Sequence, residues 1–174
     1  DEVDYALAHA MGLLIVRWPN VSASLPGSAG IPRLALSARD LRRSGHGYKV
    51  LTRTALDQVV REVELAHAVG LVRRRRMLVR SVQEVATAAG ATCIPILDSS
   101  LEITSPSGPS IVMVTPRLPE SEDLQRLDEL RNGVSPSAAA HLIHAARQIE
   151  ASRQRHLDWL LAQRRIDVRA NTDI

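Results

Sequence analysis

Phenylalanine is missing from the 174-residue sequence, and the other aromatic side chains are limited to two tryptophans and two tyrosines. Hydrophobic residues nevertheless make up 45% of the chain, close to the average for globular proteins, so there is enough apolar material for a core. Leu, Val, Ile and Ala must fill that core, and these residues suit close packing between helices. The length allows one ordinary domain or two small ones, and the composition argues against disorder throughout.

Cysteine is scarce and long hydrophobic runs are missing. Cys93 is the single cysteine, which excludes an internal disulfide and a thiolate metal cluster and agrees with a reducing compartment. The longest apolar stretch, Ala6 to Val16, contains His9 and Gly12 and is too short to cross about 30 Å of hydrocarbon. The first residues are acidic where a signal peptide would be basic. We therefore expect a cytoplasmic protein without a transmembrane segment, which reaches membranes only through its partners.

Charge of one sign is not in large excess. The 22 basic residues, all arginine except Lys49, nearly balance 19 acidic residues, so the net charge is only +3 although the sequence pI is about 9.7. This balance does not imply a protein whose whole surface binds polyanions.

Apolar residues recur at helical spacing in the first half of the chain, and each such segment has a cap or stop signal. Pro19 follows the first segment, and a glycine follows each of the others, so we predict that Gly45, Gly70 and Gly90 end helices. The predicted helices cover residues 5–17, 37–45, 54–69 and 81–89.

Short β-prone runs follow at residues 93–97, 101–104 and 110–115, separated by Ser, Pro, Gly and Asp. They predict a small antiparallel hairpin or a three-stranded sheet. Three short helices followed by a hairpin is the element order of a winged helix, in which the hairpin covers one edge of the helical cluster.

The helical pattern restarts after Pro119. Ser121 is the expected cap of a helix that carries Leu124, Leu127 and Leu130, and Ser135-Pro136 is the expected start of another. We predict an α+β, mostly helical fold of tandem winged-helix-like units with a small antiparallel hairpin. Its parts are a leading helix (residues 1–18), a first winged unit (33–116) and a smaller second unit (119–174).

Few residues are candidates for chemistry. His141 and His144 are three apart on an expected helix, but no third metal ligand accompanies them, so we interpret them as exposed or helix-capping residues. Cys93 is interpreted as a small buried hydrophobe, because no histidine is near it in sequence. Gly45-His46-Gly47 lacks the glycine spacing of a phosphate-binding loop and is interpreted as a helix stop. We therefore expect no catalytic, metal-binding or cofactor-binding site, and no enzymatic activity.

The strongest local charge is the run Arg73, Arg74, Arg75 and Arg76, with Arg80 close by. This basic patch could contact nucleic-acid phosphates or an acidic protein surface, or it could be a solvated turn between helices. Four adjacent arginines cannot all share one helical face, so at most half of them could touch one duplex.

Three segments resemble the tandem winged-helix subunits of the ESCRT-II complex. They are the leading segment Leu7–Leu14 (LAHAMGLL), the end of the first unit at Ile111–Pro116 (IVMVTP), and the turn at Asn132–Ser137 (NGVSPS). The resemblance implies a winged-helix scaffold that joins sorting subunits on endosomal membranes without catalysis. It also implies that the second unit binds a proline-plus-aromatic peptide of a partner.

The favoured function is an assembly subunit that binds other protein subunits. The expected contact surface is an apolar helix face with Leu142, Ala146, Ile149 and Trp159, where Trp159 is either core or an interface hot spot. The first alternative is a nucleic-acid-binding regulator, but its candidate recognition helix, Ser81 to Ala89, offers few donors for reading base edges. The second alternative is a helical viral structural protein.

Overall fold

A computed structural model describes residues 2–8, 10–22, 28–145 and 151–170, and these form an α+β fold. The chain divides into two compact units, residues 1–73 and 74–174. The division falls inside helix α2 (Arg53–Ala88), whereas we expected the main boundary at residues 117–118.

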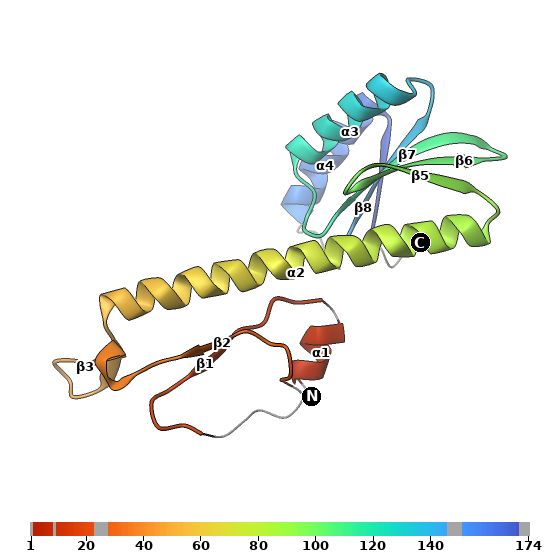
Figure 1. The fold of residues 1–174 in the computed structure, drawn as a ribbon. Helices are drawn as coiled ribbons and strands as arrows, with labels where there is room; N and C mark the ends of the chain where they lie inside the picture. The colour runs from red at the N-terminus through yellow and green to blue at the C-terminus, as the bar shows by residue number, and fades with distance from the viewer. Residues whose placement is uncertain (1, 9, 23–27, 146–150, 171–174) are drawn as a thin grey trace. The chain divides into compact units, whose positions relative to one another are not determined.

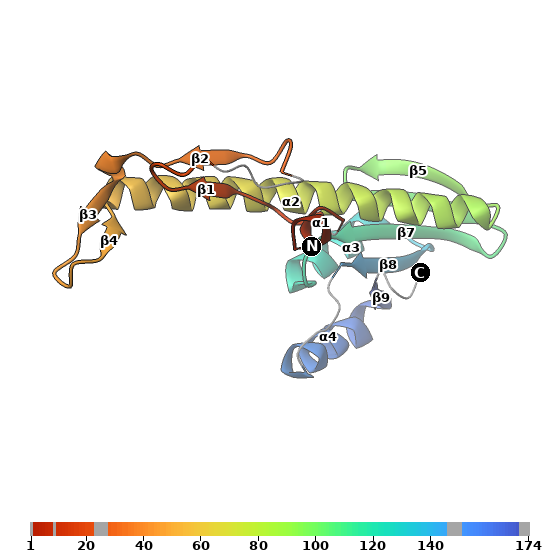
Figure 2. The same cartoon turned by 90° about the horizontal axis from the view of Figure 1, so that it is seen from below.

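The first unit consists of short elements and the first part of α2. Strands β1 and β2 pair in parallel, and β3 and β4 form an antiparallel hairpin directly before α2 (Figure 2). The elements are α1 (Glu2–Ala8), β1 (Ile15–Arg17), β2 (Arg33–Ala35), the 3-10 turn η1 (Ala38–Asp40), β3 (Leu41–Arg43) and β4 (Lys49–Leu51).

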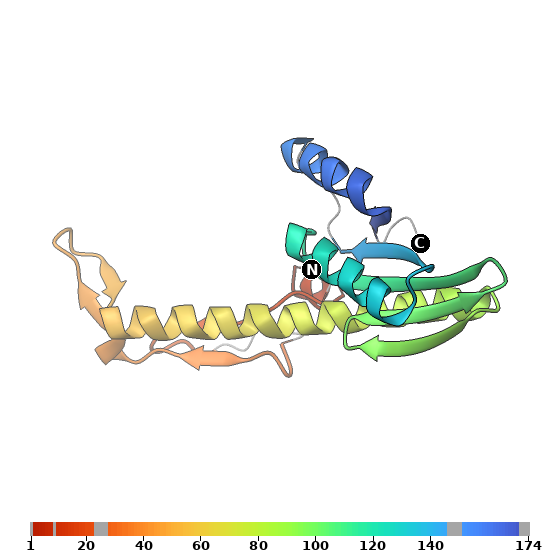
Figure 3. The same ribbon diagram turned by 90° about the horizontal axis from the view of Figure 1, so that it is seen from above.

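The second unit is built on a five-stranded sheet with the order β5-β6-β7-β8-β9. The first three strands are antiparallel to each other, and the last three are parallel, joined by α3 and α4 (Figures 1 and 3). The elements are β5 (Thr92–Leu97), β6 (Ser100–Ser105), β7 (Gly108–Thr115), α3 (Ser121–Val134), β8 (Ala139–His144), α4 (Ala151–Arg164) and β9 (Ile166–Ala170). The predicted antiparallel three-stranded sheet is confirmed in β5 to β7.

Both faces of the sheet are covered. Helices α3 and α4 pack on one face, where Leu124, Leu127 and Leu157 are buried, and the end of α2 covers the other face with Leu78 and Val82. Side chains of β7 and β8 alternate between the two cores. Ile111, Met113, Ala140 and Leu142 face α3 and α4, whereas Val112, Val114 and Ile143 face α2.

The two helices predicted at 54–69 and 81–89 are one helix, so Gly70 as a stop is wrong. A side chain at Gly70 would collide with the backbone of Gly12, with its Cβ 2.9 Å from Gly12 Cα, so close approach requires this glycine. Gly90 is confirmed as a stop. Its φ is +75°, and Gly90 N and Ala91 N donate to Thr87 O and Ala86 O, as in a Schellman motif.

The helix predicted over residues 5–17 is wrong beyond Ala8. Residues 15–17 form β1 and pair with β2, so long-range pairing overrides the helical spacing. The predicted helix at 37–45 is also wrong. Asp40 closes the predicted capping box with Ser37, but the chain then turns extended at Leu41 and enters β3.

The helix expected after Ser135-Pro136 is wrong in its first half, because residues 139–144 form β8. A parallel strand that is buried on both faces carries a continuous apolar run, and such a run matches helical spacing as well as strand spacing. The helix at Ser121 is confirmed, although its cap is Glu120 and Ser121 is its first residue. The tandem winged-helix units are not confirmed, since the separate helices that the first unit needs are merged into α2.

Candidate functional site

The structure separates the residues expected at a partner interface. Leu142 is fully buried in β8 and cannot form an exposed helix face, because its side chain belongs to the core under α3 and α4. Trp159 lies on α4 and is 60% exposed, so it is a surface residue, with its ring 6.2 Å from that of His156. Ala146 and Ile149 lie outside the described residues.

The basic patch is part of α2 and is not a turn between helices. Consecutive helical residues are about 100° apart, so Arg73 to Arg76 are distributed around the helix axis. Arg74 Nη1 donates to Pro116 O at 3.3 Å, and Arg80 Nε pairs with Glu84 Oε1 at 2.7 Å. These arginines therefore do not form a single phosphate-binding surface.

The two histidines are on strand β8, so their placement on a helix is wrong. His144 is buried, and His141 Nδ1 lies 3.4 Å from Asp167 Oδ2, to which Arg169 Nε donates at 2.6 Å. Partial burial would raise the pKa of Asp167, but the hydrogen bonds and charges of Arg169 and His141 together lower it, so the carboxylate stays ionised. Among the described residues, no three His, Cys, Asp or Glu side chains are grouped to hold a metal ion.

Cys93 lies in a strand, β5, as expected, but it is half-buried and not the fully buried residue that we predicted. Its strand is at the edge of the five-stranded sheet.

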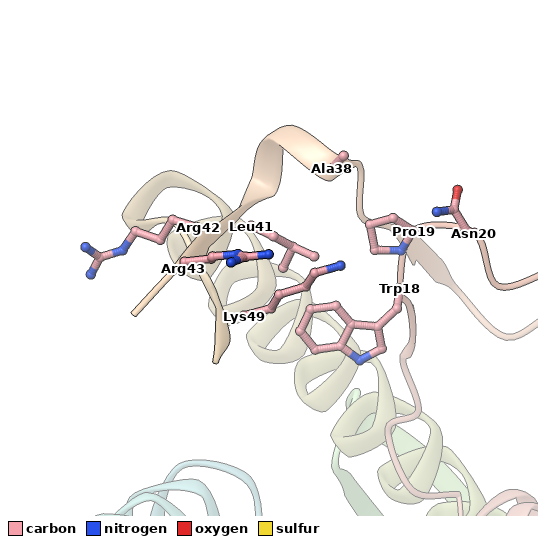
Figure 4. Close-up of a pocket in the computed structure, with 8 residues that line it drawn as sticks. All are labelled: Trp18, Pro19, Asn20, Ala38, Leu41, Arg42, Arg43 and Lys49. Atoms are coloured by element: carbon pink, nitrogen blue, oxygen red, sulfur yellow. The ribbon is translucent and has the colours of Figure 1, made fainter. Parts of the chain in front are cut away.

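A pocket of about 540 Å³ lies in the first unit between the β3–β4 hairpin and the segment after β1 (Figure 4). Its lining residues come from that segment, from η1 and from both strands of the hairpin. They are Trp18, Pro19, Asn20, Ala38, Leu41, Arg42, Arg43 and Lys49.

Strand register places two of the three cations of the pocket on the side of Trp18. Arg43 is paired with Lys49 across the hairpin, and directly opposite residues of an antiparallel pair share one face. In Figure 4 both side chains extend toward the indole of Trp18, whereas Arg42 extends away from it. Trp18 is 47% exposed, so much of its ring is open to a ligand.

The pocket is positively charged. No carboxylate is among its lining residues, and in the described part of the chain Arg42, Arg43 and Lys49 form no ion pair. The nearest acid in sequence, Asp40, is occupied: its Oδ2 accepts from Ser37 N at 2.6 Å and from Ser37 Oγ at 2.8 Å. These two hydrogen bonds lower the pKa of Asp40, and the one from the Ser37 backbone has the larger effect.

The sequence did not predict this pocket. The helix stop predicted at Gly45-His46-Gly47 is wrong, because these residues form the tip of the hairpin, where Gly47 has a φ of +81° and Tyr48 N donates to Ser44 Oγ. The pattern of basic residues on both sides of a glycine-rich turn was a signal for a charged hairpin. The position of Trp18 beside this hairpin depends on tertiary structure.

A second candidate surface is an apolar stripe on α2. Leu56, Val60 and Val63 are spaced four and three residues apart, so they lie on one side of the helix, and each is nearly half exposed. In the same unit α2 buries the small residues Ala55, Ala66 and Gly70. The helix thus exposes its larger apolar side chains and buries its smaller ones.

No helix in the described part of the chain combines the length and the apolar content needed to cross a membrane. The chain matches no protein-family model, no curated protein and no solved structure.

Proposed function

We propose that this protein is a non-catalytic assembly subunit that binds another protein chain through the apolar stripe Leu56, Val60 and Val63. The observation that carries the proposal is the exposure of three branched aliphatic side chains at helical spacing. Exposed contiguous apolar surface is costly in water, and in soluble proteins it often marks an interface. Complete burial of each side chain would contribute up to about 1.5 to 3 kcal/mol before the costs of association.

The spacing of the stripe favours a helical partner. Apolar residues at four- and three-residue intervals form the seam by which two helices pack. The surface beside the stripe carries the exposed acids Asp57 and Glu64, one heptad apart, and on the same side the exposed Arg53. We therefore propose an amphipathic partner helix with an apolar seam flanked by charged residues.

The test is substitution of the centre of the stripe. Val60→Asp places a charge where the partner's apolar seam would lie, and we expect it to reduce the partner's recovery at least about tenfold, since an unpaired charge in an interface is costly. Leu65→Asp adds the same charge in place of another exposed aliphatic side chain, on the side of α2 opposite the stripe, and serves as the matched control. The measurement is quantitative co-purification of the full chain from its native cell, with circular dichroism to check that both variants fold.

Equal recovery of the partner with both variants would contradict the proposal. So would a wild-type chain that remains monomeric in light scattering and retains no partner. The same light-scattering measurement tests the viral alternative, which requires large symmetric assemblies.

The role in endosomal sorting rests on the sequence resemblance alone and stays a prediction, as do a cytoplasmic location and the lack of enzymatic activity. Recovery of vesicle-sorting subunits with the chain would support that role.

A further inference from the structure

The basic pocket of the first unit combines two features that the assembly function does not use. Arg43 and Lys49 place two cations on one face of the hairpin, and the half-exposed indole of Trp18 lies on the side toward which they extend (Figure 4). An ammonium or guanidinium group binds phosphate, and an open indole face stacks on planar rings. A ligand that satisfies both groups carries an anion close to a flat ring.

We propose that this pocket binds a nucleotide unit, with the base stacked on Trp18 and the phosphate held between Arg43 and Lys49. The combination of a positively charged groove and an aromatic platform is the arrangement by which proteins bind single strands with little sequence preference. The volume of about 540 Å³ is within the range of pockets that hold small molecules and cofactors. The nucleotide is either free or part of a single-stranded nucleic acid, because both present the same chemistry.

The open indole distinguishes this ligand from an acidic peptide. A peptide carboxylate would use the two cations but would leave Trp18 without a stacking partner. Base stacking on an aromatic side chain changes affinity by about fivefold to a hundredfold per base when the aromatic is removed. Trp18 is therefore expected to matter as much as the cations.

The experiment follows the fluorescence of Trp18 in the full chain. Trp159→Phe leaves Trp18 as the single tryptophan, since the sequence contains two. This protein is titrated with a twelve-residue oligothymidylate, with thymidine monophosphate and with inorganic polyphosphate. We expect quenching of Trp18 by the nucleotide ligands and none by polyphosphate. A strand that binds more tightly than the monophosphate identifies a single strand as the ligand, and equal affinity identifies a free nucleotide.

The first unit provides a matched pair of variants. Arg43→Glu and Arg39→Glu make the same charge change, but Arg39 is an exposed residue of η1 and is not among the residues that line the pocket. We expect Arg43→Glu to weaken binding about tenfold or more and Arg39→Glu to weaken it less than about threefold. We also expect Trp18→Leu, measured by a labelled oligonucleotide, to weaken it at least about fivefold.

Equal loss with Arg39→Glu and Arg43→Glu would overturn the proposal, because it would indicate general attraction to the basic surface of the first unit. Quenching by polyphosphate, or no quenching at a saturating nucleotide concentration, would overturn it as well. Binding here is independent of the assembly function, so Val60→Asp is expected to leave the oligonucleotide titration unchanged.

Discussion

Gly12 and Gly70 bring two segments of the first unit closer together than side chains would permit. A Cβ at either glycine would collide with backbone, at Ala66 for Gly12 and at Gly12 for Gly70. At this contact the identity of a single residue determines whether the loop after α1 can lie against α2. Glycine in the middle of a helix is ordinarily unfavourable, and close packing here explains its presence.

We predict that Gly70→Ala destabilises the protein by about 1 to 3 kcal/mol, because relief of the collision requires backbone to move. In an exposed helix the same substitution would stabilise by up to about 1 kcal/mol. Gly133→Ala is the control, since nothing lies within 4 Å of the added Cβ in α3, and we expect no loss. Urea unfolding measures both, and a stabilised Gly70→Ala variant would show that the close approach is not formed.

At the scale of elements, α3 is stabilised by hydrogen bonds in its first turn as well as by the packing of its buried face. Asp123 Oδ2 accepts a hydrogen bond from Glu120 N at 2.9 Å, and Arg117 donates to both carboxylate oxygens at 3.0 and 3.2 Å. The Asp123 side chain is only 15% exposed, so water replaces these bonds poorly. One side chain thus caps the helix and fixes the segment that leads into it from β7.

We predict that Asp123→Ala costs about 1 to 3 kcal/mol, because it removes a cap and leaves Arg117 without its bidentate partner. Glu122→Ala, next to it in the same turn but exposed, is expected to change stability by less than about 0.5 kcal/mol. The difference between the two variants in a denaturant titration tests the assignment. Equal effects would mean that only the general charge of the first turn matters.

The helices and strands also show which elements apolar periodicity can predict and which it cannot. The predicted helix at Ser121 is confirmed because its apolar residues, Leu124 and Leu127, follow a helical period after a capping signal. Strand β8 was misread because it is buried on both faces and has no polar alternation. Trp159 was predicted to be either a core residue or an interface hot spot. Its exposure excludes the core, and the interface role stays a prediction.

At the scale of the whole molecule, the second unit contains both cores that the described residues form around the five-stranded sheet. Residues 74–88 of α2 provide Leu78 and Val82, which cover one face. Without this segment, Leu101, Val112 and Ile143 would lose their cover.

We predict that a fragment of residues 74–174 folds cooperatively, and that a fragment of residues 91–174 aggregates or unfolds, because it leaves one apolar face of the sheet in water. Circular dichroism and urea unfolding of the two fragments provide the measurement. A stable, monomeric 91–174 fragment would contradict the assignment of this helix segment to the core of the second unit.

Local signals in the sequence were sufficient for some features. The Schellman stop at Gly90, the three antiparallel strands and the helix at Ser121 all depend on residues that are neighbours in the chain, so capping and periodicity predict them.

Only tertiary structure decided the remaining features. The merging of two predicted helices into α2, the parallel pairing of β8, and the meeting of Trp18 with Arg43 and Lys49 all depend on contacts between segments distant in sequence. Such contacts leave no local pattern in the sequence. A glycine that ends a helix and a glycine that allows a neighbouring backbone to come close look alike there. The space around Gly70 therefore distinguishes these two roles, and the sequence around it does not.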